Sequence, residues 1–78
     1  MYQVAAYGYN RITSIAHGAS MEEARSVARE YVAKEDVGHV AIIGDSGITA
    51  EYWKCIDGKP RSFDARANHM AYRDMMSA

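Results

Sequence analysis

Hydrophobic and polar residues along this 78-residue chain alternate first with the two-residue period of strands and then with the 3.6-residue period of a helix. Residues 2–7 favour a strand, and Gly-Tyr-Asn at positions 8–10 favours a turn because glycine and asparagine tolerate positive φ. Residues 11–17 predict the returning strand, in which simple alternation places Ser14 and His17 on opposite faces. The N-terminal segment is therefore predicted to be a hairpin.

A helix is predicted to begin at Met21. Ser20 and Glu23 have the spacing of a capping box, in which each side chain satisfies a backbone N–H at the start of a helix. From Met21 to about Lys34, apolar side chains recur at helical spacing: Ala24, Val27, Ala28, Tyr31 and Val32. Charged side chains occupy the other side, namely Glu22, Arg25, Arg29 and Glu30. Such an amphipathic helix is expected to lie across a sheet.

The segment after the helix predicts a second hairpin. Residues 37–43 favour a buried strand, Gly-Asp-Ser-Gly at positions 44–47 favours a turn, and residues 48–56 alternate as a second strand. Asp57-Gly58 is typical of a type I′ turn, after which residues 61–63 can add a short edge strand.

The last predicted element is a helix from Ala65 to about Met76, capped by Asp64. The main elements then follow the order ββαββ before this helix. That order predicts an α+β fold, a small antiparallel sheet backed by one helix with a C-terminal helix, as a single domain over residues 1–78. A chain of this length has room for one small core.

Cysteine usage and hydropathy indicate the compartment. Cys55 is the only cysteine, which removes an internal disulfide and fits a reducing environment. The first four residues lack the basic and apolar stretches of a secretory signal, and no apolar run approaches the ~18–20 residues that span a bilayer. We therefore expect a cytosolic protein with no membrane insertion.

Charge narrows the range of partners. Nine basic and ten acidic residues give a net charge of −1, whereas a protein that binds phosphates carries excess positive charge. Direct nucleic-acid binding is accordingly not expected. The charges are uneven along the chain, because residues 1–50 hold four basic and six acidic side chains and residues 51–78 hold five and four. An anionic partner would favour the C-terminal third.

One motif suggests catalysis. Gly44-Asp45-Ser46-Gly47 matches the residues around the nucleophile of chymotrypsin-like serine proteases. Three histidines are available as bases: His17, His39 and His69. Such a site also needs an orienting acid and an oxyanion hole on a much larger scaffold. The same residue types are those that turns require, and we interpret the segment as a hairpin turn.

No other constellation indicates chemistry. The three histidines and Cys55 are separated by 22, 16 and 14 residues, so no pair has the short spacing of a metal site. No glycine-rich phosphate loop is present in the sequence. We expect no enzyme activity, no metal and no cofactor. His17 and His39 are interpreted as strand-end residues with local partners, and Cys55 as a small buried residue.

The C-terminal third combines aromatic and basic residues, the types that dominate protein interfaces. Trp53 and Phe63 lie among them, and at least one of Tyr52 and Trp53 is expected to face the core. The candidate partner-binding residues of this region are Tyr52, Lys54, Lys59, Arg61, Arg66, Tyr72 and Arg73. The region predicts a binding surface on the hairpin of residues 52–61 and the adjoining terminal helix.

Three features together resemble small phage-encoded anti-CRISPR proteins, some of which inhibit type I surveillance complexes with a compact helix-on-sheet plan. The features are the capped start Ser20-Met21-Glu22-Glu23-Ala24-Arg25, the helix through Lys34-Glu35, and the hairpin from Tyr52-Trp53-Lys54 to Asp57-Gly58-Lys59-Pro60-Arg61. Over residues 20–64, the resemblance implies a non-enzymatic inhibitor that docks on a Cas subunit in the host cytosol and blocks target DNA. The contacts that it implies are Lys59 and Arg61, with Arg25 and Arg29 as further candidates. The near-neutral charge departs from a DNA mimic, which is heavily acidic, so occlusion by shape is favoured.

Two other hypotheses remain open. One is a homodimeric regulatory or nucleic-acid-binding module that uses Arg25, Arg29, Lys59 and Arg61. The other is a small-molecule sensor built on a dimer cleft.

Overall fold

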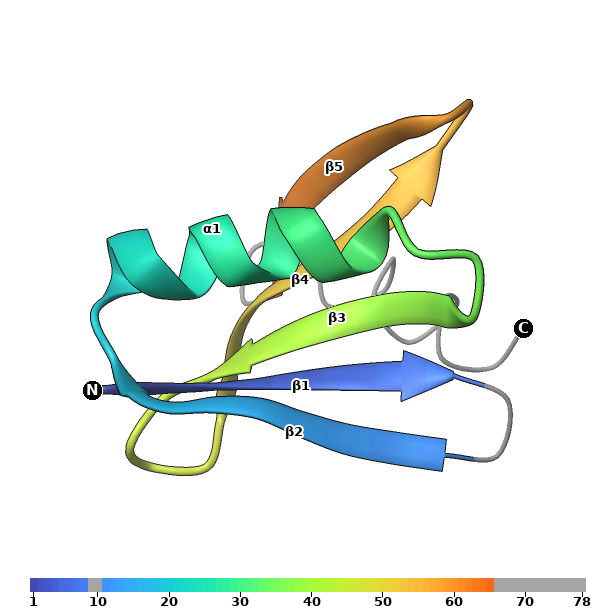
Figure 1. The fold of residues 1–78 in the computed structure, drawn as a ribbon. Coiled ribbons are helices and arrows are strands. Elements are labelled where there is room, and N and C mark those ends of the chain that lie inside the picture. The colour runs from blue at the N-terminus through green and yellow to red at the C-terminus, as the bar shows by residue number, and fades with distance from the viewer. Residues whose placement is uncertain (9–10, 66–78) are drawn as a thin grey trace.

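The structure is a computed structural model that describes residues 1–8 and 11–65. Within these residues the chain forms a five-stranded antiparallel sheet with one helix against one face (Figure 1). The elements are β1 (Tyr2–Gly8), β2 (Arg11–Ala19), α1 (Met21–Val32), β3 (Val37–Ile43), β4 (Thr49–Ile56) and β5 (Lys59–Asp64). The C-terminal helix predicted over residues 65–76 and the apex of the first turn lie outside the described residues, apart from Ala65 at the helix start.

The strands are arranged in the order β2-β1-β3-β4-β5, and every neighbouring pair is antiparallel. The predicted α+β class is confirmed, but the order ββαββ is wrong because three strands follow the helix. The third of these, β5, contains the short edge strand allowed for residues 61–63 and pairs with β4 from Ile56–Lys59 to Glu51–Asp64. It forms because Asp57 and Gly58 have φ of +53° and +77°, which the type I′ turn requires at both central positions.

The predicted start of α1 is confirmed, and one half of the capping box forms, because the Glu23 carboxylate bonds the Ser20 hydroxyl instead of the Ser20 backbone N–H. Ser20 Oγ accepts a hydrogen bond from the Glu23 amide at 3.2 Å and donates to Glu23 Oε1 at 3.0 Å. The helix ends at Val32, two residues before the predicted end, because the Lys34 amide already bonds the Tyr31 carbonyl across a tighter turn. The start of α1 is thus fixed by its own sequence.

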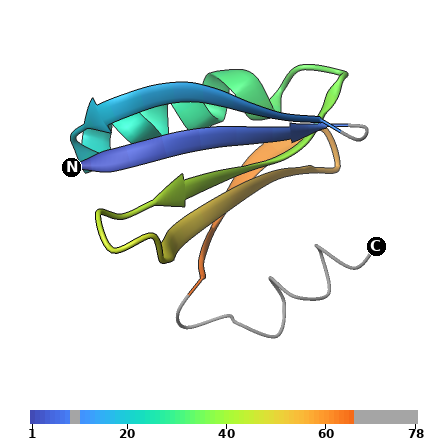
Figure 2. The same ribbon diagram turned by 90° about the horizontal axis from the view of Figure 1, so that it is seen from below.

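The core lies between α1 and the sheet. Small buried residues on the helix, Ala24 and Ala28, leave room for the larger side chains of the strands. The largest fully buried side chains are Val4, Val32, Val40 and Ile42. Trp53 completes this cluster from β4, which confirms the expectation that at least one of Tyr52 and Trp53 faces the core. Figure 2 shows α1 on one side of the sheet only, and the opposite side is called here the second face.

The edge strand β2 departs from simple alternation. Its register against β1 shifts where Val4 pairs with Ala16 and Ala5 pairs with Ser14, which leaves one extra residue in β2. This bulge brings His17 to the same side as Ser14, and Ser14 Oγ lies 2.6 Å from His17 Nε2. The prediction that these two side chains lie on opposite faces is therefore wrong, whereas the local partner expected for His17 is confirmed.

Candidate functional site

The structure divides the candidate binding residues among three environments. Arg25 and Arg29 lie on α1, above the helix face of the sheet. Four residues lie on the second face: Tyr52, Lys54, Lys59 and Arg61. The other three lie outside the described residues: Arg66, Tyr72 and Arg73. The nine residues therefore do not form one surface in the part of the chain that the structure describes.

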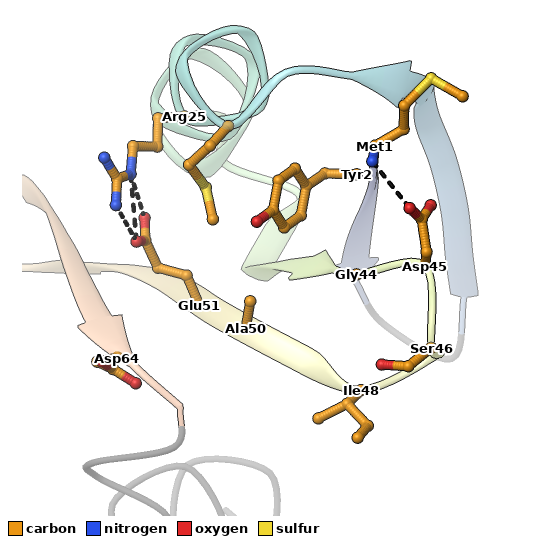
Figure 3. A pocket seen from close by; sticks show the side chains of 11 residues that line it. Met1, Tyr2, Arg25, Gly44, Asp45, Ser46, Ile48, Ala50, Glu51 and Asp64 are labelled. Carbon is orange, nitrogen blue, oxygen red and sulfur yellow. Dashed lines mark hydrogen bonds and ion pairs between the residues drawn. The ribbon is translucent and has the colours of Figure 1, made fainter.

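On the helix face, Arg25 is engaged within the chain. Its Nε lies 3.3 and 3.2 Å from the two carboxylate oxygens of Glu51, and its Nη2 lies 3.0 Å from Oε2 (Figure 3). Trp53 Nε1 donates to Glu51 Oε1 at 2.8 Å. The hydrogen bonds and the charge of Glu51 raise the pKa of Arg25. Glu51, only 9% exposed, is thus satisfied by two donors from different elements.

Arg29 also contacts the helix face of β4. Its Cζ lies 5.6 Å from the ring centroid of Trp53, within the range of a cation–π contact. Since Arg25 and Arg29 are one helical turn apart, the two guanidinium groups attach α1 to neighbouring residues of one strand. Their first role in the molecule is therefore to position the helix.

The second face begins with a stacked pair of rings. Tyr52 is 2% exposed and lies opposite Phe63 in the ladder between β4 and β5. Their ring centroids are 4.9 Å apart and their planes differ by 11°. Tyr52 is therefore a packed residue rather than an accessible contact.

Farther along the same two strands lies a group of cations, Lys54, Lys59 and Arg61, which we call the cationic patch. Lys54 lies directly opposite Arg61, and Lys59 lies opposite Ile56 in the next pair on this face. Lys59 and Arg61 are exposed, and Lys54 is half-buried. Among the residues that the structure describes, no carboxylate forms an ion pair with any of the three.

Tyr7 and His39 extend this face across β1 and β3. Their rings are stacked, with centroids 4.5 Å apart and planes within 4°. His39 lies beside Lys54, and its Nε2 is buried with no hydrogen-bond partner within the described residues. Burial lowers the pKa of His39, and the positive charge of Lys54 lowers it further. Lys54 and His39 therefore lie side by side on the second face, and both burial and the lysine disfavour the charged form of the histidine.

A cavity of about 520 Å³ lies between the start of α1 and the turn from β3 to β4 (Figure 3). Its volume falls within the range of ligand pockets. Four of the charged groups that line it pair with one another, because Arg25 binds Glu51 and the N-terminal amine lies 2.9 Å from Asp45. A ligand would have to displace these contacts in order to bind. The cavity is therefore where a small molecule would bind if the sensor hypothesis held, but its contacts do not favour that hypothesis.

The other candidates for chemistry have structural roles. The segment Gly44-Asp45-Ser46-Gly47 is the predicted turn, closed by a 2.9 Å bond from the Gly47 amide to the Gly44 carbonyl. Cys55 is exposed, contrary to the expectation of burial, because it lies on the part of the hairpin that extends beyond the core. Among the residues that the structure describes, no three His, Cys, Asp or Glu side chains are grouped to hold a metal ion.

Comparisons with known proteins give no relative. No protein-family model matches the chain, and neither the curated proteins nor the solved structures contain a match. No helix in the described part of the chain has the length and apolar character needed to cross a membrane.

Sequence reasoning identified the hairpin cations but missed two features of the site. Tyr7 stacks on His39, and these residues lie on strands that are neighbours in the sheet but are separated in sequence by β2 and α1. The partner of Arg25 is 26 residues away in sequence. The signal available in the sequence was the parity of the strands, which places Lys54, Lys59 and Arg61 on one face once the turn at Asp57-Gly58 is fixed.

Proposed function

We propose that this protein is a non-enzymatic inhibitor that docks on a nucleoprotein complex of a host defence system through the cationic patch. In this proposal a phage or mobile element encodes it, and it acts in the host cytosol by blocking access to target DNA. The patch is Lys54, Lys59 and Arg61 on the second face of the β4–β5 hairpin.

One observation supports this proposal. Two pairs of like charges face each other in the β4–β5 ladder, and an oppositely charged side chain of the described residues binds only one of the pairs. Glu51 lies opposite Asp64 on the helix face, and Arg25 binds Glu51 there. Lys54 lies opposite Arg61 on the second face, where no described carboxylate pairs with either. Like charges directly opposite in a sheet are destabilising. The repulsion between Lys54 and Arg61 is not offset by a described carboxylate of the chain. This favours an anionic group that a partner supplies.

Nucleoprotein complexes offer such groups as phosphates and as acidic side chains beside them. The resemblance to type I anti-CRISPR proteins names one class of complex. Lys59 and Arg61, the contacts that the resemblance implies, lie on the exposed edge strand β5, whereas Arg25 and Arg29 have partners within the chain. We therefore assign the docking contacts to the hairpin and not to α1.

The proposal is tested by interference and by capture. Expression in cells that carry a panel of type I CRISPR systems should restore infection by a targeted phage, and the immobilised protein should retain the purified surveillance complex. The variant Lys54→Gln/Arg61→Gln should lose both effects. No restored infection and no retained complex across the panel would refute the proposal.

A matched control separates the patch from net charge. Arg29→Gln/Lys34→Gln removes two positive charges from α1, where Arg29 lies over Trp53 and Lys34 lies 4.5 Å from the ring of Tyr31. This variant changes the net charge by the same amount and should keep the capture of the complex. Equal loss in both double variants would show that overall charge, and not the patch, is responsible.

A further inference from the structure

We infer that the cationic patch binds single-stranded nucleic acid directly, through its phosphates. The inference rests on the surface used in the proposed function, and it names the chemical class of the group that the surface contacts. It concerns the second face of the β4–β5 hairpin, which bears Lys54, Lys59 and Arg61.

The patch begins beside β3 at Lys54 and continues onto the part of the hairpin that projects from the sheet. Pairing between β3 and β4 ends at Val40–Trp53, whereas pairing between β4 and β5 continues to Ile56–Lys59. The end of the hairpin is therefore a two-stranded ribbon, which extends beyond the other strands in Figure 1. A long polymer can lie along such a ribbon without a clash with the body of the protein.

Only one face of the ribbon is charged. Lys54, Lys59 and Arg61 share the second face, and the residues on the other face are uncharged: Cys55, Pro60 and Ser62. A ribbon inserted into a duplex groove has phosphates on both sides of it. Cations on a single face instead fit a strand that lies flat against that face.

Apolar and aromatic side chains flank the cations on the same face. Ile56, which is 38% exposed, lies opposite Lys59, and the partly buried Phe63 lies two residues beyond Arg61. Single strands expose the faces of their bases, and proteins bind them by combining positive charge with aromatic side chains such as Phe63. In a duplex those faces are hidden in the stack, so the combination favours a single strand.

The net charge of −1, which led us to expect no direct nucleic-acid binding, averages two different faces. Near the patch the only carboxylate of the hairpin end is Asp57, which lies in the turn with φ of +53°. The local charge of the second face is therefore positive, and local charge determines contact with phosphates.

His39 adds a readout of binding. It lies beside Lys54 of β4 and stacks on Tyr7 of β1. Burial and the charge of Lys54 disfavour its charged form in the free protein, whereas a nearby phosphate would favour that form. Binding should therefore take up protons, and affinity should increase as the pH falls from 7.5 to 6.

The test is fluorescence anisotropy with a labelled thymidine 20-mer at ~50 mM NaCl, a concentration at which phosphate contacts remain strong. We expect saturable binding with a slope of log K against log[salt] of about −2, since three cations contribute ~0.7 each on a single strand. Lys54→Gln/Arg61→Gln should weaken binding about ten-fold and reduce that slope to about −0.7. Arg29→Gln/Lys34→Gln should change affinity less than about two-fold, because those cations lie outside the patch.

Three outcomes overturn the inference: no binding of the 20-mer at ~50 mM salt, equal loss in the two double variants, or tighter binding to a duplex of the same length. The inference and the proposed function can also fail separately. If the wild type retains a surveillance complex but binds no oligonucleotide, the patch contacts protein and this inference is wrong. If it binds the oligonucleotide but retains no complex, the proposed function is wrong and this inference remains.

Discussion

Like charges lie opposite each other on both faces of the β4–β5 ladder, but an oppositely charged side chain of the described residues binds them on only one face. On the helix face, Glu51 and Asp64 are opposed, and the guanidinium of Arg25 binds Glu51 through three contacts of 3.0–3.3 Å. On the second face, Lys54 and Arg61 are opposed, and no described carboxylate pairs with them.

This difference separates charges that build the fold from charges that are available to a partner. Arg25 and Arg29 resemble Lys59 and Arg61 in sequence, since all four are basic residues on amphipathic elements. Their neighbours assign them different roles, because the first two meet Glu51 and Trp53 and the others meet solvent. Substitutions of the basic residues on the helix face should therefore cost stability, whereas substitutions within the cationic patch should cost binding without a loss of stability.

The largest effect is expected for Trp53→Ala. Trp53 is 5% exposed, belongs to the core cluster and contacts both Glu51 and Arg29. Its removal should lower the free energy of unfolding by about 3–5 kcal/mol, the usual cost of truncating a buried aromatic residue. Urea denaturation measures this. Ile12→Ala, at a residue that is 68% exposed, is the control and should change stability by less than about 0.5 kcal/mol.

The next largest effect should come from Glu51, where two substitutions separate the roles of the carboxylate. Glu51→Leu leaves the buried indole N–H of Trp53 without an acceptor, and this should destabilise the fold by about 1–3 kcal/mol. Glu51→Gln keeps an oxygen acceptor for Trp53 and should cost less. If both variants are as stable as the wild type, the helix face does not depend on this network.

A smaller effect of opposite sign is expected on the second face. Arg61→Thr removes the cation opposite Lys54 and places a β-branched residue on an edge strand, so it should raise stability by about 0.2–1 kcal/mol. Arg29→Thr, in contrast, should lower stability, since it removes the contact with Trp53. A loss of stability in Arg61→Thr would contradict the division between the two faces.

The smallest effect is the pH dependence contributed by His39. Its pKa in the folded protein is lowered by burial and by Lys54, so the unfolded chain binds more protons near pH 6.5. Stability from this group is complete above the unfolded pKa and is lost as the pH falls below it. Comparison of urea midpoints at pH 7.5 and 5.5 should show this loss, and Lys54→Gln should reduce it. An identical pH dependence in Lys54→Gln would rule out the effect of Lys54.

Local signals predicted most of the fold. The N-cap at Ser20, with its bonds to Glu23, and the turn at Asp57-Gly58 each act within four residues, and both appear in the structure. What failed depends on contacts between distant segments. The pairing of Arg25 with Glu51, the exposure of Cys55 and the bulge that reorients His17 follow from where α1 and the strand ladders meet. The hairpin that carries the candidate cations was predicted from the sequence, but its register came only from the structure.

The exposed position of Cys55 allows site-specific labelling of the protein. It is the only thiol in the chain, and it lies on the hairpin face opposite Lys54 and Arg61. A maleimide dye or spin label attached there would need no engineered cysteine and would not cover the cations. The natural protein therefore carries its own reporter position within one residue of the surface that we expect a partner to contact.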